Sequence, residues 1–190
     1  MADEPTSPHR SIEQLRRGLD AILSAPDDAG VVRLIVRRPA VDEREVVQEA
    51  VLDVAEGLLG DSWRARGSGS TADGAADPHA QVTVVNARAA ETIAGEMERW
   101  PLTGDQLYID LDISEQNLPA GTRLSLGEAE IEMSAKPHTG CAKFAARFGL
   151  DARGFVGSPQ GRALRLRGAN ARVLRGGVVR VGDPVLKLKD

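Results

Sequence analysis

The chain has 190 residues, of which 42% are hydrophobic and 27% charged, and its formal net charge is −4. This length and apolar content suit one globular domain that buries a core without disulfides or structural metal ions. The one cysteine, Cys141, excludes an intrachain disulfide and a cysteine-rich zinc site. The N-terminus lacks a signal-peptide pattern, and no apolar stretch approaches the roughly 18 residues of a membrane span. We therefore expect a cytoplasmic protein with no membrane contact.

Charge is distributed unevenly along the chain. Residues 1–135 carry 12 basic and 25 acidic residues, whereas residues 136–190 carry 12 basic and 3 acidic residues. Two interpretations stay open: the basic half binds an anion, or the two halves neutralise each other across one fold. Nucleic acid is not an expected partner, because the whole chain is acidic and only 3% of its residues are aromatic.

The first half of the chain predicts a mixture of helices and strands. Residues 1–10 are polar and contain proline, which is typical of a disordered tail. Ser11 and Gln14 form a capping-box pattern, and apolar residues then recur at helical spacing up to Pro26. A β-branched run at residues 31–36 predicts a strand.

Residues 44–59 fit both a helix and a strand, and their apolar periodicity alone favours a helix. The Gly- and Ser-rich residues 60–80 predict a long loop, which in a compact domain is either functional or disordered. Residues 81–86 (QVTVVN) predict a strand, and residues 89–100 predict a helix that ends before Pro101.

The second half predicts short strands separated by glycine turns. The expected strands are 107–111, 123–126, 129–134, 172–174, 178–181 and 185–188. Two helical insertions, 141–148 and 159–166, interrupt them. This pattern indicates a mainly β protein, a barrel or sandwich, with peripheral helices. Residues 11–190 are expected to form one domain.

The segment SAKPHTGCAKFAARFG, residues 134–149, carries the strongest chemical signal. Its turn residues place Cys141 at the N-terminus of a helix, where free N–H groups and the helix dipole stabilise a thiolate. Lys143, Arg147 and His138 add positive charge or a proton-shuttling group nearby. Cys141 is thus a candidate nucleophile, persulfide carrier or soft-metal ligand. A buried structural thiol is the alternative.

The C-terminal half resembles the MOSC domain, which ends eukaryotic molybdenum cofactor sulfurases and also occurs as stand-alone bacterial proteins. The resemblance rests on residues 104–149, which contain SEQNLPAG and the downstream cysteine, and on RLRGANARVLRGGVVRVGDPV at residues 165–185. GLLGDSW at residues 57–63 is a fainter match, so the similarity spans about residues 31–188. It implies a β-barrel around a cleft, with residues 45–52 as a strand and 53–60 as a turn.

The resemblance also implies a site. Family members are thought to bind molybdenum cofactor or transfer sulfur to it, and some reduce N-hydroxylated compounds with partner proteins. Cys141 would then be the sulfur carrier or molybdenum ligand, with His138 as a second catalytic residue. The expected cofactor contacts are Asn117, Thr139, Gly140, Lys143, Arg147, Arg153 and Arg167. The arginines suit the phosphate of an anionic pterin cofactor, and we expect Arg147, Arg153 and Arg167 to converge on one cleft with Cys141.

Two features separate the chain from the larger family members. No desulfurase domain is present, and one cysteine cannot hold a [2Fe–2S] cluster, so a sulfur donor or reductase protein is an expected partner. Pyridoxal phosphate is associated with the family through fused enzymes, but none of the four lysines stands in a Schiff-base context. Two further hypotheses stay open: a non-catalytic module that binds a phosphate-bearing anion, and a thiol hydrolase using Cys141 and His138.

Overall fold

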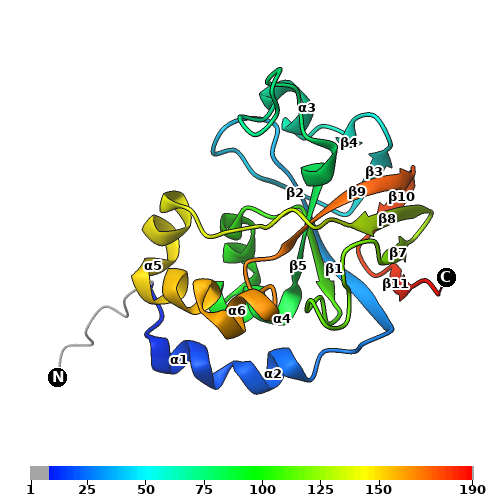
Figure 1. Ribbon diagram of the computed structural model, residues 1–190. Coiled ribbons are helices and arrows are strands. Elements are labelled where there is room, and N and C mark those ends of the chain that lie inside the picture. Colours follow the sequence, from blue (N-terminus) through cyan, green and yellow to red (C-terminus); the bar gives the residue numbers. More distant parts are fainter. Residues whose placement is uncertain (1–8, 190) are drawn as a thin grey trace.

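Seven strands close into a mixed β-barrel within residues 9–189, the part of the chain that this computed structural model describes (Figure 1). The barrel strands are β1 (Ala29–Arg37), β5 (Val82–Asn86), β6 (Leu107–Asp110), β7 (Arg123–Leu126), β8 (Ala129–Met133), β9 (Ala169–Arg175) and β11 (Pro184–Lys187). They follow the order β1-β11-β7-β8-β9-β5-β6, and β6 pairs with β1 to close the ring. All described pairs in the ring are antiparallel except β5–β6. The predicted mainly β fold with peripheral helices is confirmed.

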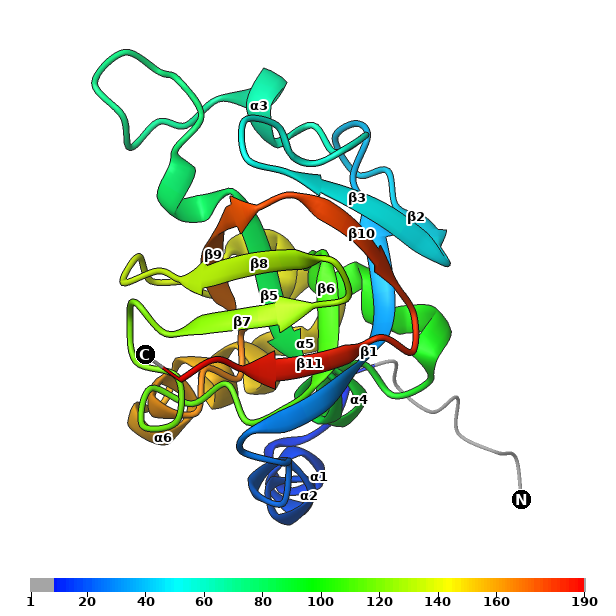
Figure 2. The ribbon, with the colours of Figure 1, turned by 90° about the vertical axis from the view of Figure 1, so that its right-hand side faces the viewer.

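A small second sheet lies against one end of the barrel (Figure 2). It consists of β10 (Gly177–Arg180), β3 (Glu49–Asp53) and β4 (Gly57–Leu58), while β2 (Glu45–Val47) extends the barrel sheet beside β1. The helix favoured by periodicity at residues 44–59 is therefore wrong, and the strand implied by the family resemblance is confirmed. Burial alternates along β3, where Ala50 and Leu52 are buried and Val51 is exposed, as expected for a strand with one covered face.

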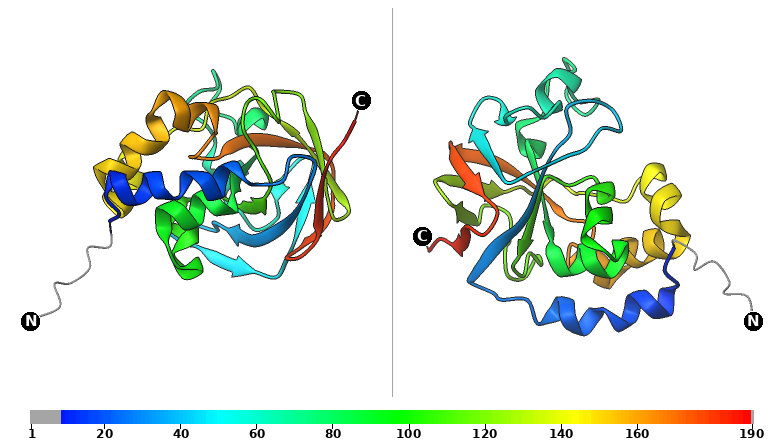
Figure 3. Two further views of the ribbon diagram at one scale, coloured as in Figure 1. Left: turned by 90° about the horizontal axis from the view of Figure 1, so that it is seen from below. Right: turned by 180° about the vertical axis from the view of Figure 1, so that it is seen from behind.

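Helices cover the opposite end of the barrel. They are α1 (Ile12–Arg17), α2 (Leu19–Leu23), α4 (Ala87–Ala94), α5 (Ala142–Gly157) and α6 (Pro159–Ala163), while α3 (Trp63–Arg66) lies near the second sheet. Seen from below, α1 and α2 run between α4 and α5 (Figure 3), and α1 contacts α5 while α2 contacts α4. The predicted N-terminal helix has its capping box but is divided at Gly18, where a Cβ would collide with Thr92 of α4.

Other predictions differ from the structure in detail. The predicted helix 89–100 becomes α4 followed by the 3-10 helix η2 (Met97–Thr103), because Gly95 adopts φ 81° and ends α4. The predicted loop 60–80 contains α3 and a 3-10 turn, η1 (Pro78–Ala80). Of the predicted tail at residues 1–10, residues 1–8 lie outside the described residues.

Two hydrophobic cores hold this arrangement together. One fills the barrel, and the other lies between the barrel and the helices. Neighbouring residues on β6 serve different cores, since Leu107 and Ile109 point into the barrel and Tyr108 packs under the helices. Because the central strands are buried on both faces, their sequences are continuous apolar runs.

The parallel β5–β6 pair needs a crossover connection, which α4 and η2 provide. The crossover ends at residues 103–105, next to the start of β6. The chain between β8 and α5 reaches the same region, and β9 follows Arg167. The fold therefore brings three separate segments together near the start of β6: residues 103–105, the chain between β8 and α5, and the residues that precede β9.

Candidate functional site

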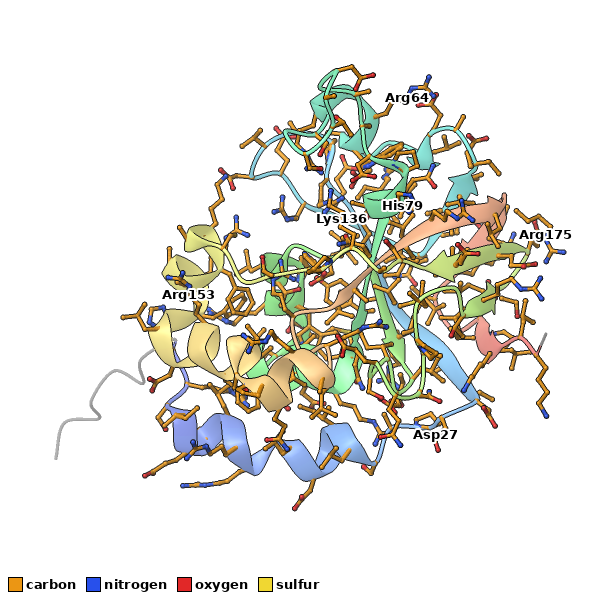
Figure 4. The ribbon with its side chains drawn as sticks, in the orientation of Figure 1. Asp27, Arg64, His79, Lys136, Arg153 and Arg175 are labelled. Atoms are coloured by element: carbon orange, nitrogen blue, oxygen red, sulfur yellow. The ribbon has the colours of Figure 1, made fainter. Side chains whose placement is uncertain are left out.

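The segment between β8 and α5 is fixed to the barrel before it reaches Cys141. The side-chain amide of Asn170, buried on β9, donates to the carbonyls of Lys136 and Pro137 at 3.1 and 3.2 Å. The Ser134 hydroxyl accepts from the Lys136 N–H at 3.0 Å. The Lys136 ammonium pairs with Asp77, which caps η1. Figure 4 shows Lys136 on this segment and Arg153 on α5. These contacts determine where the next residues, His138 to Cys141, lie.

Cys141 is the N-cap residue of α5, as predicted, and its thiol is free and exposed. Partial burial raises the pKa of the thiol, but the N–H groups of Phe144 and Lys143 and the charge of Arg167 outweigh that effect. The net result is a lowered pKa, as expected for a thiolate facing a helix N-terminus. The alternative of a buried structural cysteine is wrong, because the thiol is accessible. An accessible thiol of lowered pKa has the chemistry that a nucleophile or a soft-metal ligand requires.

His138 lies in the interior beside Asp105 rather than on the thiol. Its Nδ1 is 3.4 Å from Asp105 Oδ1, but the atom is buried without a hydrogen-bond partner. Burial, together with the charges of Arg167 and Arg38, lowers the pKa of His138 to about 4, although Asp105 opposes the shift. The imidazole is therefore neutral at pH 7. No hydrogen bond joins it to Cys141 among those that the described residues form.

Arg167 forms the centre of a buried polar network. Its Nη1 donates to both carboxylate oxygens of Asp105 at 3.2 and 2.9 Å. Asp105 also accepts from the Thr103 hydroxyl at 2.9 Å. The guanidinium lies 5.1 Å from the ring centre of Phe144 on α5, within cation–π range. The Arg167 side chain is 9% exposed and its Nε is buried without a partner, so the group keeps unused donor capacity.

A pocket of about 420 Å³ opens between the Cys141 segment, α5 and α6. Its lining includes five predicted site residues: His138, Thr139, Gly140, Arg153 and Arg167. Glu115, Lys136, Pro137, Val156, Arg162, Arg165 and Ala169 are among its other lining residues. Cys141 directly follows Gly140, so the thiol lies at the end of the segment that forms one wall. We call this space the α5–α6 pocket.

A second group of cations surrounds the 101–104 segment. We call Arg38, Arg44, Arg66 and Arg147 the Arg38 cluster. Within it, Arg38 donates to Asp61 through Nε at 2.8 Å and Nη2 at 3.1 Å, and to the Gly104 carbonyl through Nη1 at 3.0 Å. Arg44 and Arg147 donate to the carbonyls of Pro101 and Leu102 at 3.3 and 2.9 Å.

The Arg38 cluster has more positive charge than its neighbouring acids neutralise. Arg38 pairs with Asp61 and Arg147 pairs with Asp42, but Arg44 and Arg66 form no ion pair within the described part of the chain. Burial and the neighbouring charges of Arg147 and Arg38 lower the pKa of Arg44. Desolvation and the charge of Arg38 likewise lower the pKa of Arg66. An anion bound here would relieve this repulsion.

Three predicted cofactor contacts lie outside the α5–α6 pocket. Lys143 and Arg147 both bind Asp42, each at about 3 Å. Of the predicted convergence of Arg147, Arg153 and Arg167 on one cleft with Cys141, only Arg153 and Arg167 share the pocket, and neither Arg147 nor Cys141 is among its lining residues. Arg147 and Arg153 are six residues apart, which is about 240° around a helix, and α5 is kinked between them at Gly149.

The third, Asn117, is part of a loop that is fixed internally. Its amide donates to the carbonyls of Asp27 and Asp112, both at 2.7 Å, and its oxygen accepts from Lys187 at 3.0 Å. These three bonds use the side chain within the fold, so Asn117 holds the SEQNLPAG loop against β11 and does not face the pocket.

Several site residues were not predicted from the sequence. Arg38, Arg44 and Arg66 come from the N-terminal half of the chain, and Asp105 comes from the crossover between β5 and β6. Only Asp61 lies in a motif noted in the sequence, GLLGDSW. Its carboxylate accepts a hydrogen bond from the Trp63 N–H at 2.9 Å and pairs with the Arg38 guanidinium. The others have no local pattern, because their proximity depends on barrel closure.

Comparisons with known proteins place the fold and the family. The MOSC domain model matches residues 71–186. The YuaD protein from Bacillus subtilis has a similar solved structure, with a TM-score of 0.59, 16% identity, and coverage of 83% of this chain and 94% of that one. YiiM from Escherichia coli gives a TM-score of 0.55 at 20% identity, covering 84% of this chain and 70% of that one. No curated protein matches.

The structural neighbours agree with the barrel described above, and the family model covers most of it, including Cys141, both walls of the α5–α6 pocket and Arg167. No helix in the described residues is long and apolar enough to cross a membrane. With more than half of its length matched by the family model, the chain belongs to the MOSC domain family.

Proposed function

We propose that this protein binds molybdenum cofactor and that the Cys141 thiolate ligates the molybdenum or carries sulfur to it. The observation that carries the proposal is the position of Cys141. An exposed thiol of lowered pKa stands at a helix N-terminus, next to an arginine-lined pocket and near the charge of Arg167. Membership of the MOSC family supports molybdenum cofactor as the ligand. This cofactor needs both a soft ligand for its metal and positive charge for its phosphate.

The donor set fits a metal that arrives with ligands of its own. Among the described residues, no group of three His, Cys, Asp or Glu side chains could hold a metal ion. Cys141 supplies one thiolate, and the dithiolene sulfurs of the cofactor would supply other ligands. The buried, unpartnered Nε of Arg167 and the neutral ring of His138 are polar groups beside this position that a bound molecule could contact.

The Arg38 cluster is our choice for the cofactor's phosphate. Arg44 is half-buried and Arg66 is exposed, and neither forms an ion pair among the described residues, so a phosphate would pair with guanidinium groups that no carboxylate contacts directly. Charge-assisted bonds of this kind are among the strongest that proteins form. Arg38 itself is held by Asp61 and orients the cluster.

The residues of the chain would have separate tasks in this function. The N–H groups at the start of α5 favour the ionised form of Cys141, the arginines would orient the anionic cofactor, and the neutral His138 ring offers one hydrogen-bond donor and one acceptor. When bound, the cofactor supplies two-electron redox chemistry or accepts sulfur. Since the chain has one cysteine, a partner protein would deliver the sulfur or the electrons.

The experiment is cofactor analysis of the full chain purified from cells that synthesise molybdenum cofactor. Wild-type protein should contain molybdenum and yield fluorescent pterin oxidation products. Cys141→Ser should lose the molybdenum, and Arg44→Ala should lower the pterin content at least tenfold if it removes a charge-assisted phosphate contact. Arg175→Ala, an exposed arginine on β9, serves as the control. Wild-type protein without metal or pterin would refute the proposal and favour a non-catalytic anion-binding module.

A further inference from the structure

Apart from His138 and Arg167, the lining of the α5–α6 pocket is not used by the cofactor contacts proposed above. Four arginines line it, Arg153, Arg162, Arg165 and Arg167, against one acid, Glu115. Its volume of about 420 Å³ is in the range of small-molecule sites. Arg167 lies between this pocket and the Arg38 cluster, since a Cβ at Gly104 would stand 3.7 Å from Arg167 Nη2 and 4.0 Å from Arg44 Nη2.

The four arginines differ in how much of their hydrogen-bonding capacity is free. Arg165 is structural, because its Nη1 donates to the Leu118 carbonyl at 2.7 Å. Arg162 gives one bond, from Nη1 to the Gly157 carbonyl at 2.6 Å. Arg153 forms neither an ion pair nor a hydrogen bond among the interactions of the described residues. Two exposed guanidinium groups can therefore bind a ligand at the pocket.

Arg167 provides the fixed part of the same wall. Its side chain is more than nine-tenths buried, and the Asp105 carboxylate holds only Nη1. Nε is buried without a partner. A buried donor in this state is costly unless a ligand or water satisfies it. Arg167 is among the lining residues of the pocket, so an anionic ligand there would lie beside a guanidinium with unused donor capacity.

The remaining lining is apolar. Val156 of α5 is buried beside the pocket, and Pro137 and Ala169 form other parts of the wall. Gly140 lies close to Val156 and Arg153, where an added Cβ would stand 3.4 and 3.8 Å from their side chains. A ligand suited to this space has an uncharged organic body and one anionic end.

We propose that the α5–α6 pocket binds a small organic anion, a carboxylate or phosphate monoester, whose charged end pairs with Arg153, Arg162 and Arg167. Its uncharged part lies against Val156 and Pro137, and this places it beside the segment that ends at Cys141. Anion binding stands on the pocket alone. That this anion is the substrate rests on the function proposed for Cys141.

The test uses calorimetric titration of the full wild-type chain, produced without cofactor, in about 0.1 M salt to screen surface charges. The probes are benzoate, phenyl phosphate and the neutral benzamide. Benzoate or phenyl phosphate should bind at least tenfold more tightly than benzamide, and the tighter of the two anions identifies the preferred head group. Equal affinity for benzamide and both anions would overturn the proposal.

Variants locate the binding. Arg153→Ala and Arg162→Ala should each weaken binding of the preferred anion about tenfold, and Arg153→Lys should recover part of that loss because it keeps the charge. Gly157→Leu should obstruct the pocket without disturbing the fold, since a Cβ at Gly157 meets no atom within 4 Å. Arg175→Ala should bind the anion as wild type does. Loss of binding in Arg44→Ala, with retention in Arg153→Ala and Arg162→Ala, would overturn the proposal.

Failure of this inference is distinguishable from failure of the cofactor proposal. Arg162→Ala should load molybdenum and pterin normally while losing anion affinity. If Arg162→Ala keeps the anion affinity of wild type, the pocket proposal is wrong whatever the cofactor content. If wild-type protein binds the anion but carries no cofactor, the pocket is an anion site and the function proposed for Cys141 is wrong.

Discussion

Neutral His138 should make the folded protein sensitive to mild acid. The pKa of its ring, whose side chain is 17% exposed, is about 4, whereas histidine in an unfolded chain titrates near 6.5. Below about pH 6.5 the unfolded state therefore binds the proton more readily, and stability falls as pH decreases towards 4. Linkage gives a loss of about 2 kcal/mol between pH 8 and pH 5, and about 3 kcal/mol once both states are protonated.

The assay is urea unfolding of wild type and His138→Gln at pH 8, 6, 5 and 4.5. Carboxylates such as Asp77, whose pKa is lowered by Lys136, also lose stabilisation in acid, but they are common to both proteins. The difference between the two stability curves isolates His138. Wild type should lose about 2 kcal/mol more than His138→Gln between pH 8 and pH 5. Parallel curves over that range would refute the neutral, buried ring.

Three further predictions concern the site and its support. Cys141 should react with iodoacetamide at pH 6–7 faster than an ordinary exposed thiol of pKa ~8.5, and reaction only after unfolding would refute its thiolate character. Arg38→Ala should cost about 3–5 kcal/mol in urea unfolding, because it leaves the fully buried Asp61 carboxylate unpaired; a loss below about 1 kcal/mol would show that Asp61 finds another partner. Tyr108→Phe should lower stability by about 1–3 kcal/mol by removing the hydroxyl bonded to the Trp100 carbonyl, and an unchanged midpoint would contradict that role.

The strands were predictable where local pattern and tertiary environment agree. In β7 and β8, buried and half-buried residues alternate, and glycine turns mark the strand ends. Residues 44–59 misled the periodicity analysis because valines and alanines recur there at helical spacing, while burial of Ala50, Leu52 and Leu58 in the barrel core selects the extended form. The family resemblance corrected this, since it carries information on the complete fold.

The site was predictable only in its local part. Cys141 follows Gly140 and precedes a helical pattern, so its position at a helix N-terminus could be derived from a few neighbouring residues. The partners of Arg38, Arg167 and Arg147 could not, because Asp61, Asp105 and Asp42 come from distant segments. The ion pairs of Arg167 and Arg147 with acids of the first half support the interpretation that the two halves neutralise part of each other's charge across the fold. Within the basic half, Arg153 and Arg162 are among the arginines that form no ion pair in the described part of the chain.

The most direct test of the central claim is a crystal structure of the cofactor-loaded protein with anomalous data collected at the molybdenum absorption edge. The account predicts an anomalous peak within bonding distance of Cys141 Sγ, with the pterin phosphate at Arg44 and Arg66. A molybdenum peak away from Cys141, or cofactor bound with the thiol uninvolved, would contradict it.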